Sequence, residues 1–368
     1  TGVRVQGLGS ELKPNSQQPT ANSQHPTANS QYQTHNTHLF QHLKIWQLGD
    51  DYTRHCGKYP VIFLTFKDIK ENNWNDCEYQ LKKTISREYE RHEYLLESKF
   101  LSESQKKDFL SIKDLTANTL DYKHSLKNLT QLLQQHYKEK VVVLIDEYDT
   151  PVHEAFAGKY YENVIDFLRP FLGAGLKDNV NLQICVITGI LRVSRENLFS
   201  DLNNIDIFTI LEAEYSDKFG ILESEVAQMF HDFGIESDLE DAKKWYNGYV
   251  IGGTKDIYNP WSIINYVEHH RDGFKPYWVN TSSNKMIKDL MAKGDTFLKA
   301  DLQKLVKGNT IEKKIEPHTV FADLERNNDS IWTLLLFAGY LKILKIRRDE
   351  WNKFWYELAI PNMEVAGV

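Results

Sequence analysis

The feature that most constrains the fold is a run of five apolar residues that ends in two carboxylates. Val141 to Ile145 reads VVVLI, and Asp146 and Glu147 follow it directly. A continuous apolar run of this length, rich in β-branched residues, is typical of a strand buried on both faces. In open parallel sheets, ligands bind beyond the carboxyl ends of the strands. The sequence therefore predicts a central strand whose polar end lies in a functional position.

Two further apolar runs, and the helical patterns between them, indicate the class of fold. Residues 59–66 (YPVIFLTF) and 182–187 (LQICVI) also read as buried strands. Apolar residues at helical spacing fall in residues 74–92, 126–133 and 164–172. Alternating strands and helices predict an α/β protein with right-handed crossovers and a parallel sheet that has helices on both faces.

Composition divides the chain into three predicted parts. Residues 18–24 (QPTANSQ) are repeated as residues 25–31 (HPTANSQ), and this composition has too little apolar surface to offset the entropy of ordering. We therefore expect residues 1–36 to be a disordered low-complexity segment, serving as a linker or, alternatively, as a binding motif. Residues 37–210 should form the α/β core, and residues 211–368 a mainly helical second part.

Local signals place several elements in that second part. Asn259 and Pro260 form an N-cap followed by proline at the first helical position, which predicts a helix through Tyr266. Thr281 or Ser282 would cap another helix. Residues 332–344 are strongly apolar, and residues 354–360 read as one more strand.

Bulk properties exclude several classes of protein. The net charge of −7 argues against a general nucleic-acid binder, because any attraction to phosphate must then come from a local basic face. No apolar run reaches the roughly 18–20 residues that cross a bilayer, and residues 1–10 lack the pattern of a secretory signal. The three cysteines show no C-x-x-C spacing, so neither a disulfide framework nor a zinc site is indicated. We expect a cytoplasmic protein without a membrane partner.

The carboxylates after residue 145 have the arrangement that nucleotide hydrolases need. Asp146 would hold Mg²⁺ through water, because Mg²⁺ keeps part of its hydration shell. Glu147 would polarise the attacking water as a general base, and Asp149 could support either residue. The alternative is a buried strand that simply ends in a polar turn.

A second candidate site follows the strand at residues 182–187. Thr188 stands where a polar side chain could touch the attacking water or a terminal phosphate, and Arg192 and Arg195 could meet phosphate charge. Alternatively, both arginines face solvent or pair with nearby acidic residues.

Two weaker patterns lie in the second part of the chain. Glu312 and Lys314 have the E-x-K spacing of restriction-like nucleases, with Asp301 upstream, although such triplets arise by chance in Lys- and Glu-rich sequence. Residues 245–249 (WYNGY) form a turn with aromatic flanks, for which core packing is the simpler interpretation and a stacking platform the alternative.

No segment of the printed sequence can form the usual phosphate-binding loop. Such a loop needs G-x-x-x-x-G-K-[ST], in which backbone N–H groups wrap the phosphates and lysine neutralises them. The two Gly-Lys pairs, at residues 57–58 and 158–159, are each followed by tyrosine, and neither has a glycine five residues earlier.

Ordered blocks along the chain resemble the bacterial AAA-ATPase-like proteins that commonly carry a C-terminal PD-(D/E)xK-type nuclease domain. The blocks are residues 39–45 (LFQHLKI), 57–70 (GKYPVIFLTFKDIK), 144–151 (LIDEYDTP), 188–204 (TGILRVSRENLFSDLNN), 245–249 (WYNGY), 258–263 (YNPWSI), 277–284 (YWVNTSSN) and 360–365 (IPNMEV). The resemblance implies a P-loop NTPase scaffold, with ATP and Mg²⁺ as cofactors. It places Asp146 and Glu147 at the Walker B pair, Thr188 in the strand-end TG motif, and Arg192 and Arg195 at the basic positions after it.

The same resemblance implies that two family features are not found here. The family's P-loop precedes the block at residues 39–45, where this chain has the repeat segment, and its nuclease domain follows the block at residues 360–365. We therefore expect a truncated or degenerate member with weak or absent ATP hydrolysis. The alternatives are an ATPase whose loop is supplied by a missing segment or a partner, and a non-enzymatic scaffold that binds protein or nucleic acid.

The absent loop also has a consequence for the sheet. In P-loop ATPases the strand leading into the loop lies between the Walker B strand and the strand after it. We expect the strands at residues 141–145 and 182–187 either to flank a gap or to close into a direct pair, since strands pair at about 4.8 Å. Residues 3–8 could instead fill the gap.

Overall fold

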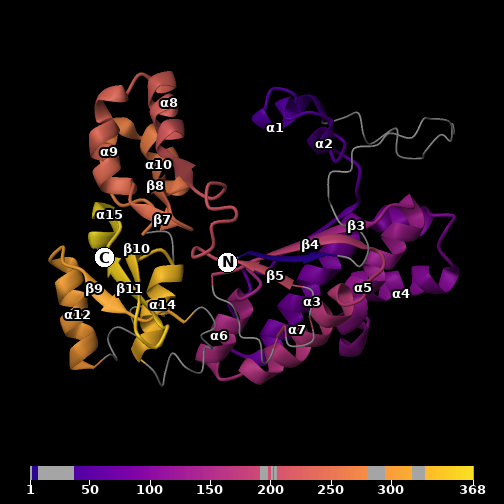
Figure 1. The fold of residues 1–368 in the computed structure, drawn as a ribbon. Helices are drawn as coiled ribbons and strands as arrows, with labels where there is room; N and C mark the ends of the chain where they lie inside the picture. The colour runs from indigo at the N-terminus through magenta and orange to yellow at the C-terminus, as the bar shows by residue number, and fades with distance from the viewer. Residues whose placement is uncertain are drawn as a thin grey trace. The chain divides into compact units, whose positions relative to one another are not determined.

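A computed structural model describes residues 2–6, 37–190, 198–199, 202, 205–279, 295–316 and 328–367 (Figure 1). The chain divides into two compact units, the first built mainly on residues 2–189 and the second on residues 207–368. The domain boundaries expected at residues 36 and 210 stay predictions.

The first unit is an α/β structure. Its strands are β1 (Gly2–Gln6), β2 (Val61–Thr65), β3 (Val141–Asp146), β4 (Leu182–Thr188) and, at the division between the units, β5 (Ile205–Phe208). Its helices are α1 (Lys44–Gln47), α2 (Asp50–Thr53), α3 (Trp74–Arg91), α4 (Glu103–Lys113), α5 (Thr119–Tyr137), α6 (Thr150–Gly158) and α7 (Tyr161–Leu176). The strand order is β2-β3-β4-β1-β5.

Strands β2, β3 and β4 are the three apolar runs of the sequence, and they pair in parallel. Helices connect them in sequence and flank the sheet, so the predicted α/β class is confirmed. Strands β3 and β4 are direct neighbours, with Leu144 opposite Val186 and Ile145 opposite Ile187. Of the two arrangements that we expected, a gap or a direct pair, the structure shows the direct pair.

Strand β1 lies in the segment that we expected to be disordered or, as an alternative, to fill a gap in the sheet. Residues 2–6 are ordered as a strand, although we placed them in the disordered part. They also do not fill a gap between β3 and β4, because β1 pairs antiparallel with the other edge of β4, from Gly2 opposite Thr188 to Gln6 opposite Ile184. The physical reason is that β4 offers an unpaired backbone edge there, and the sequence of β1 carries two β-branched valines. Residues 7–36 lie outside the described residues.

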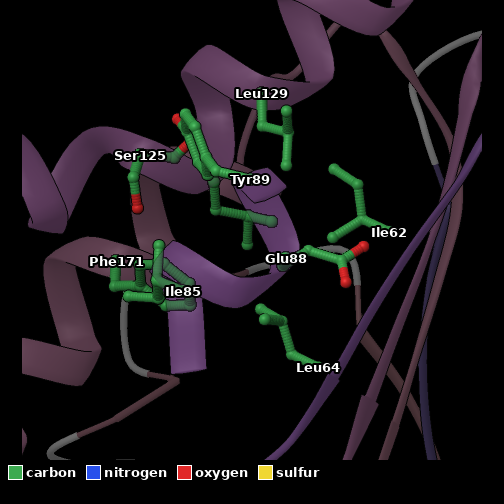
Figure 2. A pocket seen from close by; sticks show the side chains of 9 residues that line it. Ile62, Leu64, Ile85, Glu88, Tyr89, Ser125, Leu129 and Phe171 are labelled. Carbon is green, nitrogen blue, oxygen red and sulfur yellow. The ribbon is translucent and has the colours of Figure 1, made fainter. Parts of the chain in front are cut away.

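The two faces of the parallel sheet differ in how far they are covered. Ile62, Leu64, Val143, Ile145 and Cys185 are buried on one face. Side chains of β2 line a small hollow there together with side chains of α3, α5 and α7, as Figure 2 shows. On the opposite face, Val61, Phe63 and Val186 each stay at least a third exposed. Apolar burial on the helix-covered face is therefore what holds this layer together.

A buried carboxylate protects the edge of the sheet at β2. Glu88, on α3, accepts a hydrogen bond from the outward-facing backbone N–H of Phe63 at 2.9 Å. The other carboxylate oxygen of Glu88, Oε2, accepts from the Arg91 guanidinium at 2.7 Å. His92 Nε2 lies 3.2 Å from Oε1, the oxygen that accepts from Phe63. Figure 2 shows Glu88 among the apolar side chains of the hollow. Because these polar groups satisfy one another, we interpret the hollow as packing space and not as a ligand site.

The second unit contains more helix than strand, together with two small antiparallel sheets that the sequence analysis did not foresee as sheets. Strands β6 (Ile221–Leu222), β8 (Thr254–Tyr258) and β7 (Tyr249–Ile251) form one, and β10 (Lys342–Arg348), β11 (Phe354–Ala359) and β9 (Ile311–Lys313) the other, each in the order given. The helices are α8 (Glu223–Phe233), α9 (Leu239–Tyr246), α10 (Pro260–Glu268), α12 (Thr296–Val306), α14 (Asn328–Phe337) and α15 (Met363–Ala366).

Several local predictions in the second unit can be compared with the structure. Asn259 caps α10 by accepting from the backbone N–H groups of Trp261 and Ser262, which confirms that helix start. The strand expected at residues 354–360 is β11. The apolar stretch at residues 332–344 is α14 followed by the start of β10. The helix expected after Thr281 or Ser282 lies outside the described residues.

Candidate functional site

The end of β3 turns sharply immediately after Asp146. Glu147 has a φ of 50°, in the left-handed region that side chains other than glycine rarely adopt. Helix α6 then begins at Thr150, with Pro151 in its first turn. The backbone N–H of Tyr148 donates to the carbonyl of Thr188 at 3.1 Å, so the turn remains attached to the end of β4. Strained backbone of this kind is concentrated at functional positions.

The Asp146 carboxylate lies between two threonines from the neighbouring strands. Thr188 Oγ1, at the end of β4, donates to Asp146 Oδ1 at 2.6 Å. Thr65 Oγ1, at the end of β2, lies 3.4 Å from Asp146 Oδ2, a weaker interaction. All three residues stand at the carboxyl ends of adjacent parallel strands. The structure thus brings together Asp146 and Thr188, which the sequence had singled out, and adds Thr65, which it had not.

Glu147 forms its side-chain hydrogen bond outside this group of three side chains. Its side chain is exposed, and its carboxylate accepts a hydrogen bond from Thr150 Oγ1 at 3.1 Å. The left-handed turn at Glu147 therefore separates the two carboxylates of the Asp-Glu pair. Asp146 faces the strand ends, and Glu147 lies over the first turn of α6.

Asp149 is the buried acidic residue of the site. It is 1% exposed, and Nε2 of His153, one turn further along α6, lies 3.1 Å from its carboxylate. Gly189 packs closely against it, because a Cβ atom built at that glycine would lie 2.7 Å from Asp149 Oδ1 and 2.7 Å from the Tyr148 ring. Both residues of the Thr-Gly sequence at the end of β4 therefore contribute to this arrangement. Thr188 supplies a hydroxyl, and Gly189 is small enough to pack against Asp149.

The remaining candidate residues do not join this group within the described part of the chain. Arg192 and Arg195 lie outside the described residues. Asp301 bonds to Lys313 at 2.7 Å, whereas Glu312 forms a two-pronged ion pair with Arg347. Glu312 and Lys313 are neighbours on β9, and neighbouring residues on a strand point to opposite faces. Asp301 therefore lies on the face opposite to Glu312, and the nuclease-like triplet is not assembled.

The motif blocks of the second unit meet in one buried hydrogen-bonded group. Glu364, 1% exposed, accepts from Ser262 Oγ and from the backbone N–H groups of Tyr277 and Trp278, each at 2.7 Å. The Asn362 side-chain amide donates to the carbonyl of Asn247 at 2.9 Å. These contacts give the blocks at residues 245–249, 258–263, 277–284 and 360–365 a structural role. The burial of Tyr246 agrees with core packing, which was the simpler interpretation of the aromatic turn at residues 245–249.

Cysteine chemistry is not suggested near the site. Burial raises the pKa of the Cys77 thiol to about 12, and burial likewise raises the pKa of Cys185, on β4. Neither side chain therefore forms the thiolate that acts as a nucleophile. In the described part of the chain, no three His, Cys, Asp or Glu side chains gather as metal ligands, and no helix is long and apolar enough to cross a membrane.

Comparisons with known proteins agree with the motif-based resemblance. Residues 27–199 match the AAA-ATPase-like family, described as predicted AAA-ATPase. An uncharacterized protein in the vnfD 5′ region of Azotobacter chroococcum mcd 1 is 28% identical to this chain over 228 residues. That alignment covers 62% of this chain but only 41% of the relative, so the chain spans less than half the length of that protein. No solved structure matches the chain.

Proposed function

We propose that the first unit of this AAA-ATPase-like chain places Asp146 and Glu147 at the Walker B positions and Thr188 at the sensor position, and that the 368-residue chain does not hydrolyse nucleotide by itself. The family match over residues 27–199 supports the ATPase scaffold. Asp149 would then support the pair from the protein interior, and Arg192 and Arg195 would be the basic residues that follow the sensor. The association with a nuclease domain stays a prediction.

The observation that carries the proposal is the direct pairing of β3 with β4. The pairing lets Thr188 donate to Asp146 at 2.6 Å, so the carboxylate is already bonded within the sheet. A carboxylate that instead held hydrated Mg²⁺ would direct its oxygens to water and phosphate. Glu147, the residue expected to act as base, accepts a hydrogen bond from Thr150 on the first turn of α6.

The residues present fit Mg²⁺ and ATP only in part. Asp146 supplies one carboxylate and Thr65 and Thr188 supply hydroxyls, which is an oxygen-donor set of the type that hydrated Mg²⁺ accepts. Nucleotide phosphates, however, need a backbone cradle with a lysine, and the printed sequence contains no such motif. We therefore assign neither a bound nucleotide nor a hydrolytic step to this chain.

This proposal predicts the outcome of an ATPase assay on the full chain. Phosphate release in the presence of ATP and Mg²⁺ should be the same for the unchanged protein, for Glu147→Gln, and for Glu97→Gln, which alters an exposed carboxylate in the same unit. Calorimetric titration should show no saturable binding of ATP. Turnover that disappears in Glu147→Gln but persists in Glu97→Gln would disprove the proposal, because Glu147 would then be acting as a catalytic base.

A further inference from the structure

The β10–β11 hairpin in the second unit ends in a rigidly held turn. Arg348 and Phe354 form its last register pair. Within the turn, Asp349 accepts from the backbone N–H groups of Trp351 and Lys353 at 2.9 and 2.8 Å, and from the Trp355 indole N–H at 2.9 Å. The hydrogen bond from Trp355 holds the pKa of Asp349 below its usual value, so the clamp is intact at neutral pH. The turn therefore presents its other side chains in a fixed arrangement.

Two aromatic side chains project into solvent from this hairpin. Trp351 is 81% exposed, and Phe354 is 46% exposed. Large aromatic side chains dominate interface energetics, so two of them exposed on one fixed turn make the turn a candidate contact surface. Trp351 in particular offers most of its surface to a partner.

Several cationic side chains lie on the same hairpin as these rings or next to it. Lys345, Arg348 and Lys353 are exposed, and in the described part of the chain none of them belongs to an ion pair. The Arg348 guanidinium lies 4.6 Å from the centre of the Phe354 ring. Lys314, which follows β9, lies 4.8 Å from the centre of the Trp355 ring. The hairpin is thus a local basic and aromatic surface on a chain whose net charge is −7.

We propose that this hairpin binds single-stranded nucleic acid. Trp351 and Phe354 would stack on bases, and Lys345, Arg348 and Lys353 would contact phosphates, which is the combination used by proteins that bind single strands without sequence preference. The inference is independent of the proposed loss of ATP hydrolysis, because it rests on residues of the second unit alone.

Two observations favour a single strand over a duplex groove or a lipid surface. Trp351 is 81% exposed, and such a ring stacks on unpaired bases, whereas the bases within a duplex already stack on one another. Glu350 stands exposed beside Trp351. Inserting that tryptophan into the apolar part of a membrane interface would take the Glu350 carboxylate out of water, which stacking on an exposed base does not require.

Fluorescence anisotropy with a labelled 20-nucleotide oligothymidylate tests the proposal on the full chain. Trp351→Ala should raise Kd by about tenfold, since one base–aromatic stack is typically worth that much. The matched control is Trp261→Ala, which removes a tryptophan that is 52% exposed on α10 of the same unit, and it should leave Kd unchanged.

Salt dependence provides the second measurement. The triple variant Lys345→Gln, Arg348→Gln and Lys353→Gln should reduce the slope of log K against log salt by about 2, since each phosphate contact to a single strand contributes about 0.7. The matched control replaces three exposed lysines of the first unit (Lys70, Lys99 and Lys107) by glutamine.

Three results would overturn the proposal: no binding at 50 mM salt, equal effects of the hairpin and control variants, or binding only to vesicles containing phosphatidylserine. The last result would identify the hairpin as a lipid contact. Unchanged far-ultraviolet circular dichroism of each variant ensures that a loss of binding is not a loss of folding.

Discussion

Replacing Glu364 by alanine should lower the free energy of unfolding of the second unit by about 3–5 kcal/mol, because it leaves buried donors without an acceptor. Glu364 accepts from Ser262 Oγ and from two backbone N–H groups, those of Tyr277 and Trp278. The Ser262 hydroxyl and the Glu364 carboxylate are almost fully buried, and the two backbone donors are partly buried, so water replaces the lost acceptor poorly. Calorimetry should show the corresponding transition about 10 °C lower for a unit of this size.

Two further variants make this result specific. Glu364→Gln keeps one carbonyl oxygen but turns an NH₂ group toward N–H donors. Its free energy of unfolding should therefore be about 1–3 kcal/mol lower than that of the unchanged protein. Glu214→Ala, which removes an exposed carboxylate of the same unit, should change the stability by less than about 0.5 kcal/mol. If Glu364→Ala lowered the free energy of unfolding as little as Glu214→Ala, Glu364 would not join the motif blocks in the way the hydrogen bonds indicate.

Replacing Gly248 by alanine should also lower the free energy of unfolding of the second unit, by about 3 kcal/mol or more. Gly248 has a φ of +106°, and a Cβ atom there would lie 2.1 Å from the carbonyl oxygen of Pro361. That oxygen also accepts from Lys342 Nζ at 3.1 Å, so it cannot move away without losing a hydrogen bond. The added methyl group would therefore separate the Trp-Tyr-Asn-Gly-Tyr turn from the Ile-Pro-Asn segment.

Gly253→Ala separates the two causes of that loss of stability, the positive φ and the steric clash. Gly253 also has a positive φ, of +88°, but nothing lies within 4 Å of its Cβ position. Its replacement should cost only the backbone penalty, roughly 1–2 kcal/mol. Denaturant unfolding of both variants measures the difference. Equal losses would show that residues 248 and 361 do not pack as closely as the structure indicates.

Much of the first unit could be predicted from the sequence because its signals are strong and local. The runs that become β2, β3 and β4 are continuous and apolar, and α3, α5 and α7 carry regular apolar positions. The end of β3 was also recognisable, since Asp146 and Glu147 follow the strand directly. Periodicity alone therefore identified the sheet and the edge at which the candidate site lies.

Other features depend on contacts between distant residues, and the sequence did not reveal them. Thr65 joins Asp146 only because β2 and β3 pair in one particular register. Strand β1 joins the sheet antiparallel at the free edge of β4, which local composition does not encode. Apart from β11, which the sequence did indicate, the strands of the second unit are short or, like β10, interrupted by a register shift between Ile343 and Lys345, so their alternation is too weak to recognise.

The proposed lack of hydrolysis depends most on the direct pairing of β3 with β4, and a disulfide test measures this pairing. Leu144 and Val186 are register partners. Cysteines placed at both positions, with Cys56→Ser as background, should form a disulfide on mild oxidation, because adjacent strands bring Cα atoms within the range of about 4.4–6.8 Å that a disulfide spans.

The matched control pairs Phe63→Cys with Val186→Cys, which lie two strands apart and about 9.6 Å from each other. Mass spectrometry under oxidising and reducing conditions should show the 144–186 crosslink in nearly all molecules and the 63–186 crosslink in almost none. Failure of the 144–186 pair to crosslink in folded protein would mean that another segment separates the two strands. Asp146 and Thr188 would then not be held together, and the proposed loss of hydrolysis would lose its structural basis.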